Sequence, residues 1–269
     1  FCFDDNYNEV FEGLTAGEIS GAMKQAFTAT SFSSKFEWIG YDACITSYLD
    51  AASVNADYFN FMLASQENEN SLGWDYKTSF KRIYDNPSQD SKILLKNIAK
   101  DYVDSYASGE IYEECGYNDQ TMSLLDLSKM PALTSAFESY VSNFKNDSNA
   151  LENCFSAFEE CELLFGYYFD LWTYSLVYES GLADFNEFLS ILHETYPSYS
   201  IDAVVTALNN LVVASYYGDY YDDFTLKPCG INVFVAVGIS FECEIDDDDY
   251  LYPDPESLER CELYPYLSK

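Results

Sequence analysis

The sequence predicts an α/β fold in which a sheet is flanked by helices, with a helix-rich middle section and a late buried strand. Three observations support this fold class. Residues 36–64 read as an apolar run, a helix-like segment and a second apolar run. Apolar residues then recur at helical spacing through most of 79–192. Residues 230–241 are rich in β-branched side chains, which is typical of a buried strand or strand pair.

The first helix is predicted to run from about Ala16 to Thr28. Thr15 and Glu18 have the spacing of a capping box. Leu14 and Ile19 flank that box as a hydrophobic staple, which strengthens the assignment of this helix start.

A strand, a helix and a second strand are predicted at residues 36–41, 44–53 and 57–64. This order and spacing indicate two parallel strands joined by a crossover. In such sheets the working residues gather at the carboxyl ends of the strands. We therefore expect the candidate site in the turn at 42–44 and in the loop at 65–76.

The middle of the chain is predicted to be helical over residues 79–106 and 133–192, with the clearest interruption at 109–119. A set of apolar side chains within the second region could be a ligand-binding stripe, but core packing explains it better. Its members are Phe155, Phe158, Leu163, Phe165, Tyr168, Phe169 and Trp172. Another amphipathic helix is expected at 201–214.

The end of the chain differs in composition from the rest. Residues 246–249 are four consecutive aspartates, and 250–269 contain three prolines, which favours an irregular segment. We find no internal repeat. The expected organisation is one domain over residues 1–241, followed by an acidic, proline-containing tail over 242–269.

The chain is strongly acidic, with 46 Asp and Glu against 13 Lys and Arg and a formal net charge of −33. Such a charge repels nucleic acids and anionic membrane surfaces and favours cationic substrates or divalent ions. The alternative is that the charge supplies solubility or salt tolerance. No stretch approaches the ~20 apolar residues of a membrane span, and residues 1–20 do not resemble a signal peptide.

Eight cysteines are present, but none forms a C-x-x-C pair, so a zinc site is not expected. Some of them could form disulfides in an exported protein. Cys44 is the candidate nucleophile, because a thiol after a strand and at the start of a helix has a lowered pKa and an exposed position. The alternative is a small buried hydrophobic residue. The only histidine, His193, lies far away in sequence, and we expect it to be structural.

Residues 41–47, Tyr-Asp-Ala-Cys-Ile-Thr-Ser, resemble the nucleophile segment of the clostripain family of cysteine peptidases. Ala-Asp-Tyr at 56–58, Ala-Ser-Gln-Glu at 64–67 and Gly-Trp-Asp-Tyr at 73–76 are similar to further landmarks of that family, in the same order and at similar spacing. The segments at 1–5 and 230–234 extend the resemblance over most of the chain.

The resemblance implies a caspase-like sheet flanked by helices and hydrolysis of peptide bonds after basic residues by a Cys/His dyad. Cys44 would be the nucleophile, and its own amide would be one oxyanion donor. Asp42 matches the acidic wall of a pocket for Arg or Lys. Further substrate-binding candidates at matched positions are Ala43, Ser65, Glu67 and Trp74.

Three departures from the family pattern matter. Nothing here matches the family histidine, which lies upstream in a His-Gly turn, so the chain looks like a heavy chain completed by a His-bearing light chain or N-terminal segment. Leu72 stands at the second acidic pocket position. Gln66 replaces a family glutamate, which we interpret as a neutral change at a pocket rim. The resemblance, the acidity and the cysteine count together predict a secreted or cell-surface protein.

No cofactor is expected, although calcium is weighed because some clostripain relatives depend on it. Residues 4–15 begin like a calcium loop, but Glu9 occupies the position of the turn glycine and Thr15 that of the bidentate glutamate. The aspartates at 246–249 could bind calcium loosely, but a solvated acidic run explains them better.

Two other functions stay open beside the peptidase. The first is a catalytically inactive acidic binding or adhesion module that retains the peptidase fold, which Leu72 and Gln66 favour. The second is an unrelated acidic protein that binds cationic peptides, for which Asp42 would matter and Cys44 would not.

Overall fold

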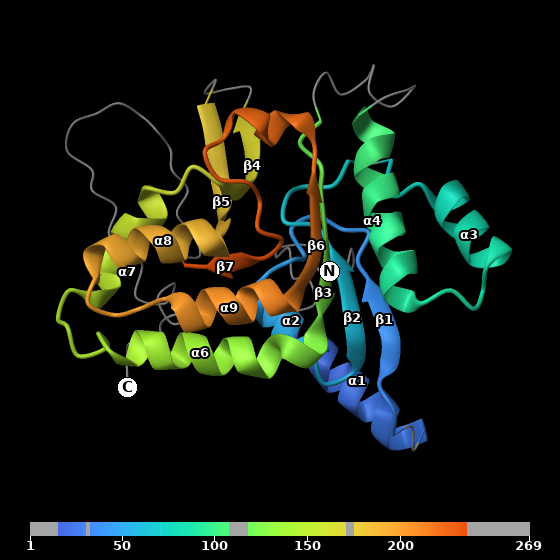
Figure 1. Cartoon of the computed structure of the whole chain (residues 1–269), viewed down its shortest axis with the longest axis horizontal. Coiled ribbons are helices and arrows are strands. Elements are labelled where there is room, and N and C mark those ends of the chain that lie inside the picture. Colours follow the sequence, from blue (N-terminus) through green and yellow to red (C-terminus); the bar gives the residue numbers. More distant parts are fainter. Residues whose placement is uncertain (1–15, 31–32, 71, 108–117, 171–174, 236–269) are drawn as a thin grey trace, which may run out of the picture.

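A computed structural model describes residues 16–30, 33–70, 72–107, 118–170 and 175–235. Its centre is a four-stranded mixed sheet with helices packed on both faces, and a second, three-stranded sheet lies beside it (Figure 1). The predicted fold class, a sheet with flanking helices, is therefore confirmed.

The first half of the chain contains α1 (Ala16–Thr30), β1 (Phe36–Gly40), α2 (Leu49–Asn55), β2 (Phe59–Ala64), α3 (Tyr76–Asp85), α4 (Ser91–Ala107) and β3 (Thr121–Asp126). The second half contains η1 (Leu127–Lys129), α6 (Met130–Ser142), α7 (Ala150–Glu159), β4 (Leu164–Asp170), β5 (Ser175–Asp184), α8 (Phe185–Thr195), α9 (Asp202–Leu211), β6 (Val212–Tyr217), η2 (Asp219–Asp223) and β7 (Asn232–Phe234).

The main sheet has the strand order β1-β2-β3-β6. β1 and β2 are parallel, with Phe36 opposite Phe59 and Gly40 opposite Leu63, so the predicted parallel pair is confirmed. β2 with β3 and β3 with β6 are antiparallel pairs. β1 is an outer strand of this sheet, and its carboxyl end lies next to that of β2.

The two faces of the main sheet bury different clusters of side chains. Leu63, Met122 and Leu124 pack against α4, whereas Met62 and Leu125 belong to the cluster that includes residues of α2, α6 and α9. Neighbouring residues of one strand point to opposite faces, so both faces of a strand that is covered on both sides must be apolar. This explains why β3 is buried along its whole length.

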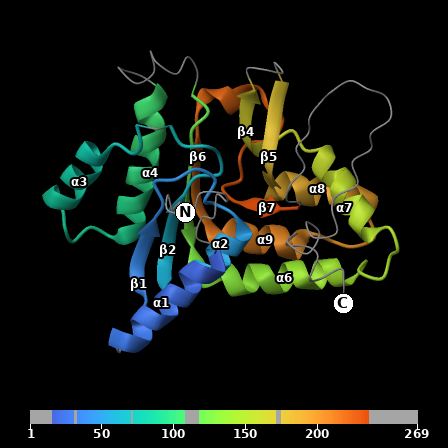
Figure 2. The same ribbon diagram turned by 180° about the vertical axis from the view of Figure 1, so that it is seen from behind.

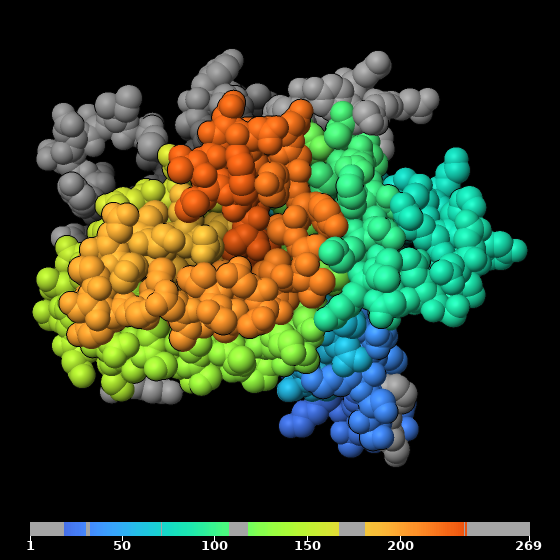
Figure 3. Space-filling model, in the orientation of Figure 1, coloured from blue at the N-terminus to red at the C-terminus, as the bar shows by residue number. Residues whose placement is uncertain are grey.

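Two helices extend outward from the covered sheet. α1 crosses the amino-terminal ends of β1 and β2, where Phe27 contacts Phe36 and Tyr58 with ring centroids 5.5 and 5.0 Å apart (Figure 2). α3 projects from the body beside α4 (Figure 3). Arg82 of α3 pairs with Asp101 of α4 through two hydrogen bonds, which fixes the outer helix on the inner one.

The second sheet is antiparallel in the order β4-β5-β7. It joins the main sheet through Asn232 of β7, whose backbone N–H donates to the Ser47 carbonyl at 2.8 Å. The Ser47 hydroxyl donates to the Gly230 carbonyl at 2.6 Å. The segment between β1 and α2 is therefore held from both sides, by β2 and by β7.

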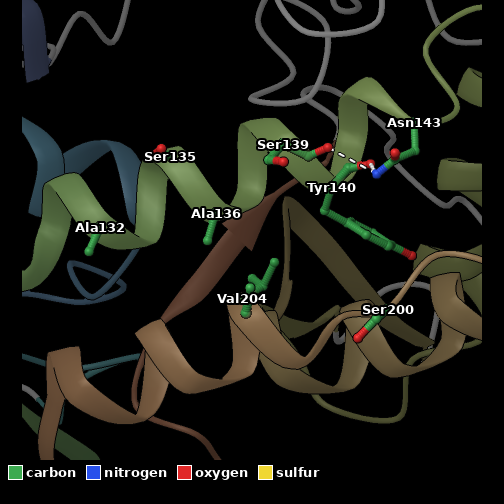
Figure 4. Close-up of a pocket in the computed structure, with 9 residues that line it drawn as sticks. Ala132, Ser135, Ala136, Ser139, Tyr140, Asn143, Ser200 and Val204 are labelled. Carbon is green, nitrogen blue, oxygen red and sulfur yellow. Dashed lines mark hydrogen bonds between the residues drawn. The ribbon is translucent and has the colours of Figure 1, made fainter.

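A shallow groove of about 450 Å³ lies between α6 and α9 (Figure 4). Small side chains such as Ala132, Ala136 and Ser139 leave this space between the two helices, and Val204 and Ser200 form its other side. The groove is lined by no charged residue, and none of its lining residues is a histidine, carboxylate or amine that could activate the hydroxyl groups of Ser135, Ser139 or Ser200.

Several sequence-based expectations are wrong. Residues 164–170 and 175–184 form strands inside the region that was expected to be helical. Aromatic residues there favour strands, and Gly166, with φ 76°, lies at a register shift between β4 and β5. The helix expected at 201–214 ends at Leu211 and continues directly into β6. β3 was not expected at all, because a strand buried on both faces has no polar alternation to reveal it.

The helix expected at 44–53 begins only at Leu49 and ends at Asn55. The backbone N–H groups of Tyr41, Ile45 and Ser47 instead donate to Leu63 in β2 and to Glu67 and Ser65 after it, so these residues do not make helical hydrogen bonds. Helix α1 and the strands at 36–40 and 59–64 agree with expectation. The late strand is confirmed at 232–234. The capping box residue Thr15, the acidic run at 246–249 and the tail at 242–269 lie outside the described residues.

Candidate active site

The candidate site lies where β1 and β2 end side by side. The segments that follow the two strands stay together beyond the sheet, because Tyr41, Ile45 and Ser47 donate backbone hydrogen bonds to Leu63, Glu67 and Ser65 at 3.0, 3.1 and 2.8 Å. A parallel strand pair places both carboxyl ends at one edge of the sheet. The turn at 42–44 and the loop at 65–76 therefore meet, as the sequence predicts.

Cys44 lies exposed in the turn after β1. The backbone N–H of Glu69 donates to its Sγ at 3.3 Å, so the loop after β2 holds the thiol from one side. The Thr46 hydroxyl donates to the Ala43 carbonyl at 3.2 Å and closes the turn. The exposure expected for Cys44 is confirmed, but α2 begins five residues later, so its dipole is not positioned to act on the thiol.

The residue after the cysteine, Ile45, has a φ of 54°. A β-branched residue in the left-handed region is strained by roughly 1–2 kcal/mol. Such strain persists only where the surroundings fix the backbone. Here the Ile45 amide is fixed by its hydrogen bond to Glu67, and the strained turn is what presents the Cys44 side chain to solvent.

Two carboxyl groups lie beside the cysteine. Asp42 Oδ2 accepts a hydrogen bond from the Tyr76 hydroxyl at 2.6 Å, and Glu69 Oε2 accepts one from Trp74 Nε1 at 3.1 Å. Burial, and next the adjacent Asp42, raise the pKa of Glu69 to about 10. Sequence reasoning missed Glu69. The sequence signal that could have revealed it is its position. Glu69 lies between the Ala-Ser-Gln-Glu and Gly-Trp-Asp-Tyr segments, in the loop that the sequence predicts beside the cysteine turn.

Gly73 fixes the loop against Asp42. Its φ is 68°, and a Cβ at this position would lie 2.8 Å from Asp42 Oδ2. The Tyr106 hydroxyl donates to the Gly73 carbonyl at 2.8 Å. Only glycine combines this backbone conformation with so close an approach. The predicted substrate-binding residue Asp42 therefore lies against the Gly-Trp-Asp-Tyr segment on one side and is exposed to solvent on the other.

Three other predicted site residues are buried. Ser65 and Glu67 are 0% and 1% exposed, and Trp74 is 9% exposed. The Ser65 hydroxyl lies 2.9 Å from the Thr121 hydroxyl of β3. The Trp74 ring packs on Gly40, where a Cβ would lie 2.7 Å from the ring. These side chains shape the loop around Cys44, and their part in substrate binding stays a prediction.

Glu67 is a buried acid behind the site. Its Oε1 accepts hydrogen bonds from the backbone N–H groups of Asn68 at 2.6 Å and Gly166 at 3.2 Å. Its Oε2 is buried without a partner among the described residues. Burial raises the pKa of Glu67 to about 7. The carboxyl group therefore links the site loop to β4 and changes its charge near neutral pH.

Gln66 was interpreted as a residue of a pocket rim, and this interpretation is wrong. Its side chain is fully buried and donates to Asp184 Oδ2 and Asn232 Oδ1 at 3.1 and 2.8 Å, while Gly230 N–H donates to its Oε1 at 2.6 Å. Burial raises the pKa of Asp184, which also accepts a hydrogen bond from the Cys229 amide at 2.6 Å. Gln66 therefore joins the main sheet to the second sheet.

His193, the only histidine of the chain, does not approach the cysteine. His193 lies in the last turn of α8, beside the second sheet and on the opposite side of the molecule from β1 (Figures 1 and 2). Leu72 is 54% exposed. Within the described ranges Cys44, Cys161 and Cys229 are free thiols, and Cys154 is buried. Disulfides of the other four would lie outside those ranges.

Within the part of the chain that the structure describes, no three His, Cys, Asp or Glu side chains are placed to hold a metal ion. The calcium loop weighed at residues 4–15 and the aspartates at 246–249 lie outside that part. A search of the described helices for one long and apolar enough to span a membrane found none.

The comparisons with known proteins agree with this geometry. The sequence model of the clostripain family matches residues 1–240. No curated protein sequence matches. One similar solved structure is a clostripain from Bacteroides thetaiotaomicron in complex with the peptide inhibitor BTN-VLTK-AOMK, at 14% identity and a TM-score of 0.56 over 85% of this chain and 88% of that one.

Two further structures are similar. A B. fragilis cysteine protease has 15% identity and a TM-score of 0.57, over 87% of each chain. A secreted C11 cysteine protease from Bacteroides thetaiotaomicron has 16% identity and a TM-score of 0.52, over 75% of this chain and 47% of that one. At these identities the likeness concerns the fold, and it confirms the caspase-like arrangement that the sequence predicts.

Proposed function

The chain belongs to the clostripain family of cysteine peptidases, and from this premise we propose that it is the cysteine-bearing part of an endopeptidase that cleaves after basic residues. The observation that carries this proposal is the position of Cys44. Its exposed thiol lies at the carboxyl edge of a parallel strand pair and is held by the amide of Glu69. A merely structural cysteine would be buried and inert.

The reaction would follow the pattern of covalent catalysis by a thiolate. Cys44 Sγ would attack the carbonyl carbon of the substrate and form a thioester, while the amine leaves with a proton from an imidazole. Water would then hydrolyse the thioester. Backbone N–H groups of the turn would bind the oxyanion. Cys44 supplies the nucleophile, and the rest of the dyad must come from another segment.

We place that segment, a His-bearing light chain or N-terminal part, at the outer edge of β1. Among the described strands β1 pairs only with β2, so its other edge offers backbone groups to a further strand. Phe36 of β1 is 45% exposed, which a covering segment would bury. A strand paired there would end beside the Cys44 turn if it ran parallel to β1. His193 cannot serve, because α8 lies on the other side of the molecule.

Specificity for basic residues is proposed from the carboxyl groups of Asp42 and Glu69 beside the thiol. The net charge of −33 adds a long-range attraction for cationic peptides. Domain limits of 1–241 for the peptidase domain and 242–269 for a tail, and an exported location, are part of the same proposal. One similar structure is described as a secreted protease, which supports the location.

The first experiment is denaturing intact-mass analysis of the protein purified from its natural source, followed by peptidase assays with Arg and Lys substrates. We expect a co-purifying polypeptide with a His-Gly turn and turnover that Cys44→Ala abolishes. Cys154→Ala, at a buried thiol of α7, is the matched control and should retain turnover. Turnover that survives Cys44→Ala would refute the assignment.

The second candidate function is an inactive acidic binding module with the same fold. It is favoured by the absence of any histidine near Cys44 within the described residues, since His193 lies on α8. A lone chain that binds basic peptides without turnover, with equal affinity in the wild type and Cys44→Ser, would support this alternative over the peptidase.

A further inference from the structure

Helix α3 carries a row of aromatic side chains on its outer surface. Tyr76, Phe80 and Tyr84 follow one another at four-residue spacing, which places them on one face of the helix. They are 46%, 63% and 85% exposed. We call these three residues the aromatic row. A surface helix normally turns its apolar face to the core and its polar face to water, and α3 does the reverse along this row.

The side of α3 that faces the body is polar. Ser79 is buried, and the Arg82 guanidinium donates to Asp101 of α4 at 2.8 Å. An ion pair therefore holds α3 on α4, and the helix projects from the body with its aromatic row in solvent (Figure 3). The row adds little to the core of this chain. Contiguous apolar surface that stays exposed in this way marks a binding site for another molecule.

The aromatic row begins at the candidate active site. The Tyr76 hydroxyl donates to Asp42 Oδ2 at 2.6 Å, and Asp42 belongs to the turn that carries Cys44. The Tyr76 ring stacks on Trp74 and on Phe80, with ring centroids 6.4 and 5.7 Å apart and interplanar angles of 26°. Ring contacts therefore lead without a break from the loop beside the thiol onto the exposed surface of α3. This continuity points to the substrate as the molecule that covers the row.

The spacing of the row fits an extended peptide. Four residues of an α-helix rise by about 6 Å, and every second side chain of an extended chain is displaced by about 6.6 Å. A peptide that lies along α3 would therefore place alternate side chains on successive rings. Apolar side chains gain most from such a contact, because they leave water and the ring faces require no hydrogen-bond partner.

We propose that the aromatic row binds the polypeptide substrate beyond the residues held at the cysteine turn, and that it selects apolar side chains at alternate positions. This inference rests on the proposed function, because it requires a peptide with its carbonyl at Cys44. It adds a preference that is separate from the residue at the cleaved bond. Two leucines partly buried on the rings should raise kcat/KM about tenfold over serines at the same positions.

The test uses the full chain with any polypeptide that co-purifies, and internally quenched peptides of equal length that contain a single lysine. Each peptide has an eight-residue extension on the amino or the carboxyl side of the lysine. In the extension leucine alternates with serine, in either phase, or serine fills every position. We expect one side and one phase to give a kcat/KM about tenfold above that of the all-serine peptide.

Variants then locate the preference on α3. The double variant with Phe80→Ser and Tyr84→Ser removes two exposed rings, so it should fold normally and lower the leucine-to-serine ratio of kcat/KM to about one. Tyr84→Phe keeps its ring and should keep the preference. Tyr220→Ser is the matched control, because Tyr220 is also an exposed aromatic residue but lies on η2, which packs on β4 through Tyr221 and Phe165. Its ratio should equal that of the wild type.

Equal kcat/KM for leucine and serine extensions in the wild type would overturn the inference, while cleavage after lysine that Cys44→Ala abolishes would leave the proposed function standing. The inference would also fail if the double variant kept the full preference. A wild type that sediments as a dimer and a double variant that sediments as a monomer, both with the same ratio, would assign the row to self-association instead. If no peptide is cleaved, the proposed function fails and this inference with it.

Discussion

Replacing the buried acid Glu67 by glutamine should change how stability depends on pH. In the folded protein burial raises the pKa of this carboxyl from 4.5 to about 7, whereas in the unfolded chain it keeps its ordinary value. Between these two values the folded state binds more protons than the unfolded state. The free energy of unfolding contributed by Glu67 therefore falls as pH rises from about 4.5 to about 7, and is constant above that range.

The size of the effect follows from the same two values. A difference of about 2.5 pKa units, at about 1.36 kcal/mol per unit, corresponds to about 3 kcal/mol. Glutamine keeps an oxygen that can accept the hydrogen bonds from the backbone N–H groups of Asn68 and Gly166. The glutamine side chain carries no charge at any pH. Its amide nitrogen would lack a partner where Glu67 Oε2 is buried, but that penalty of about 1–3 kcal/mol does not depend on pH.

The assay is thermal unfolding of the wild type and Glu67→Gln at pH 4 and pH 8, followed by circular dichroism. About 3 kcal/mol corresponds to roughly 6–12 °C for a chain of this size. The difference in Tm between variant and wild type should shift by that amount in favour of the variant as pH rises. Glu69 and the other acids are present in both proteins, so their titration cancels when the Tm of the variant is compared with that of the wild type at the same pH. A difference that is the same at both pH values would refute the reasoning.

Other substitutions probe the site and its supports. Gln66→Ala removes buried hydrogen bonds between the two sheets and should lower stability by roughly 2–4 kcal/mol in urea unfolding; an unchanged midpoint would contradict this role. Gly73→Ala places a Cβ 2.8 Å from Asp42 at a φ of 68°, so it should raise KM for basic substrates severalfold more than for neutral ones. Ile45→Gly relieves the strained φ of 54° and should slow Cys44 labelling while Tm changes by only a few degrees; faster labelling would argue against strain as the feature that presents the thiol.

The sequence by itself predicted the part of the site formed by residues close together in the chain, namely the two strands and the turn that carries Cys44. The apolar runs at 36–40 and 59–64 are short, separated by a helix-sized segment and bounded by polar residues, which leaves a parallel pair as the simplest arrangement. That arrangement brings Cys44 and the loop after β2 to one edge. The ordered landmarks gave the family, because several short matches in the same order are far more specific than any one of them.

Only the tertiary structure decided which acids meet. Glu69 is separated from Cys44 by 25 residues, and its pairing with Asp42 depends on backbone hydrogen bonds across the ends of β1 and β2. Gln66 finds its partners 118 and 166 residues away, in Asp184 and Asn232. Hydrophobic periodicity contains no information about such contacts, because they depend on which buried polar groups remain unpaired once the sheets are packed.

Hydrophobic periodicity also failed to predict three strands, β3, β4 and β5. β3 is covered on both faces, and β4 and β5 are stabilised by pairing with each other, so neither case leaves a pattern that local periodicity can separate from a helix. The sequence by itself therefore determined the chemistry-bearing turn and its neighbour strand, which local spacing encodes. The tertiary structure decided the raised pKa of Glu69 beside the thiol, because burial and a neighbouring carboxylate exist only in the folded chain.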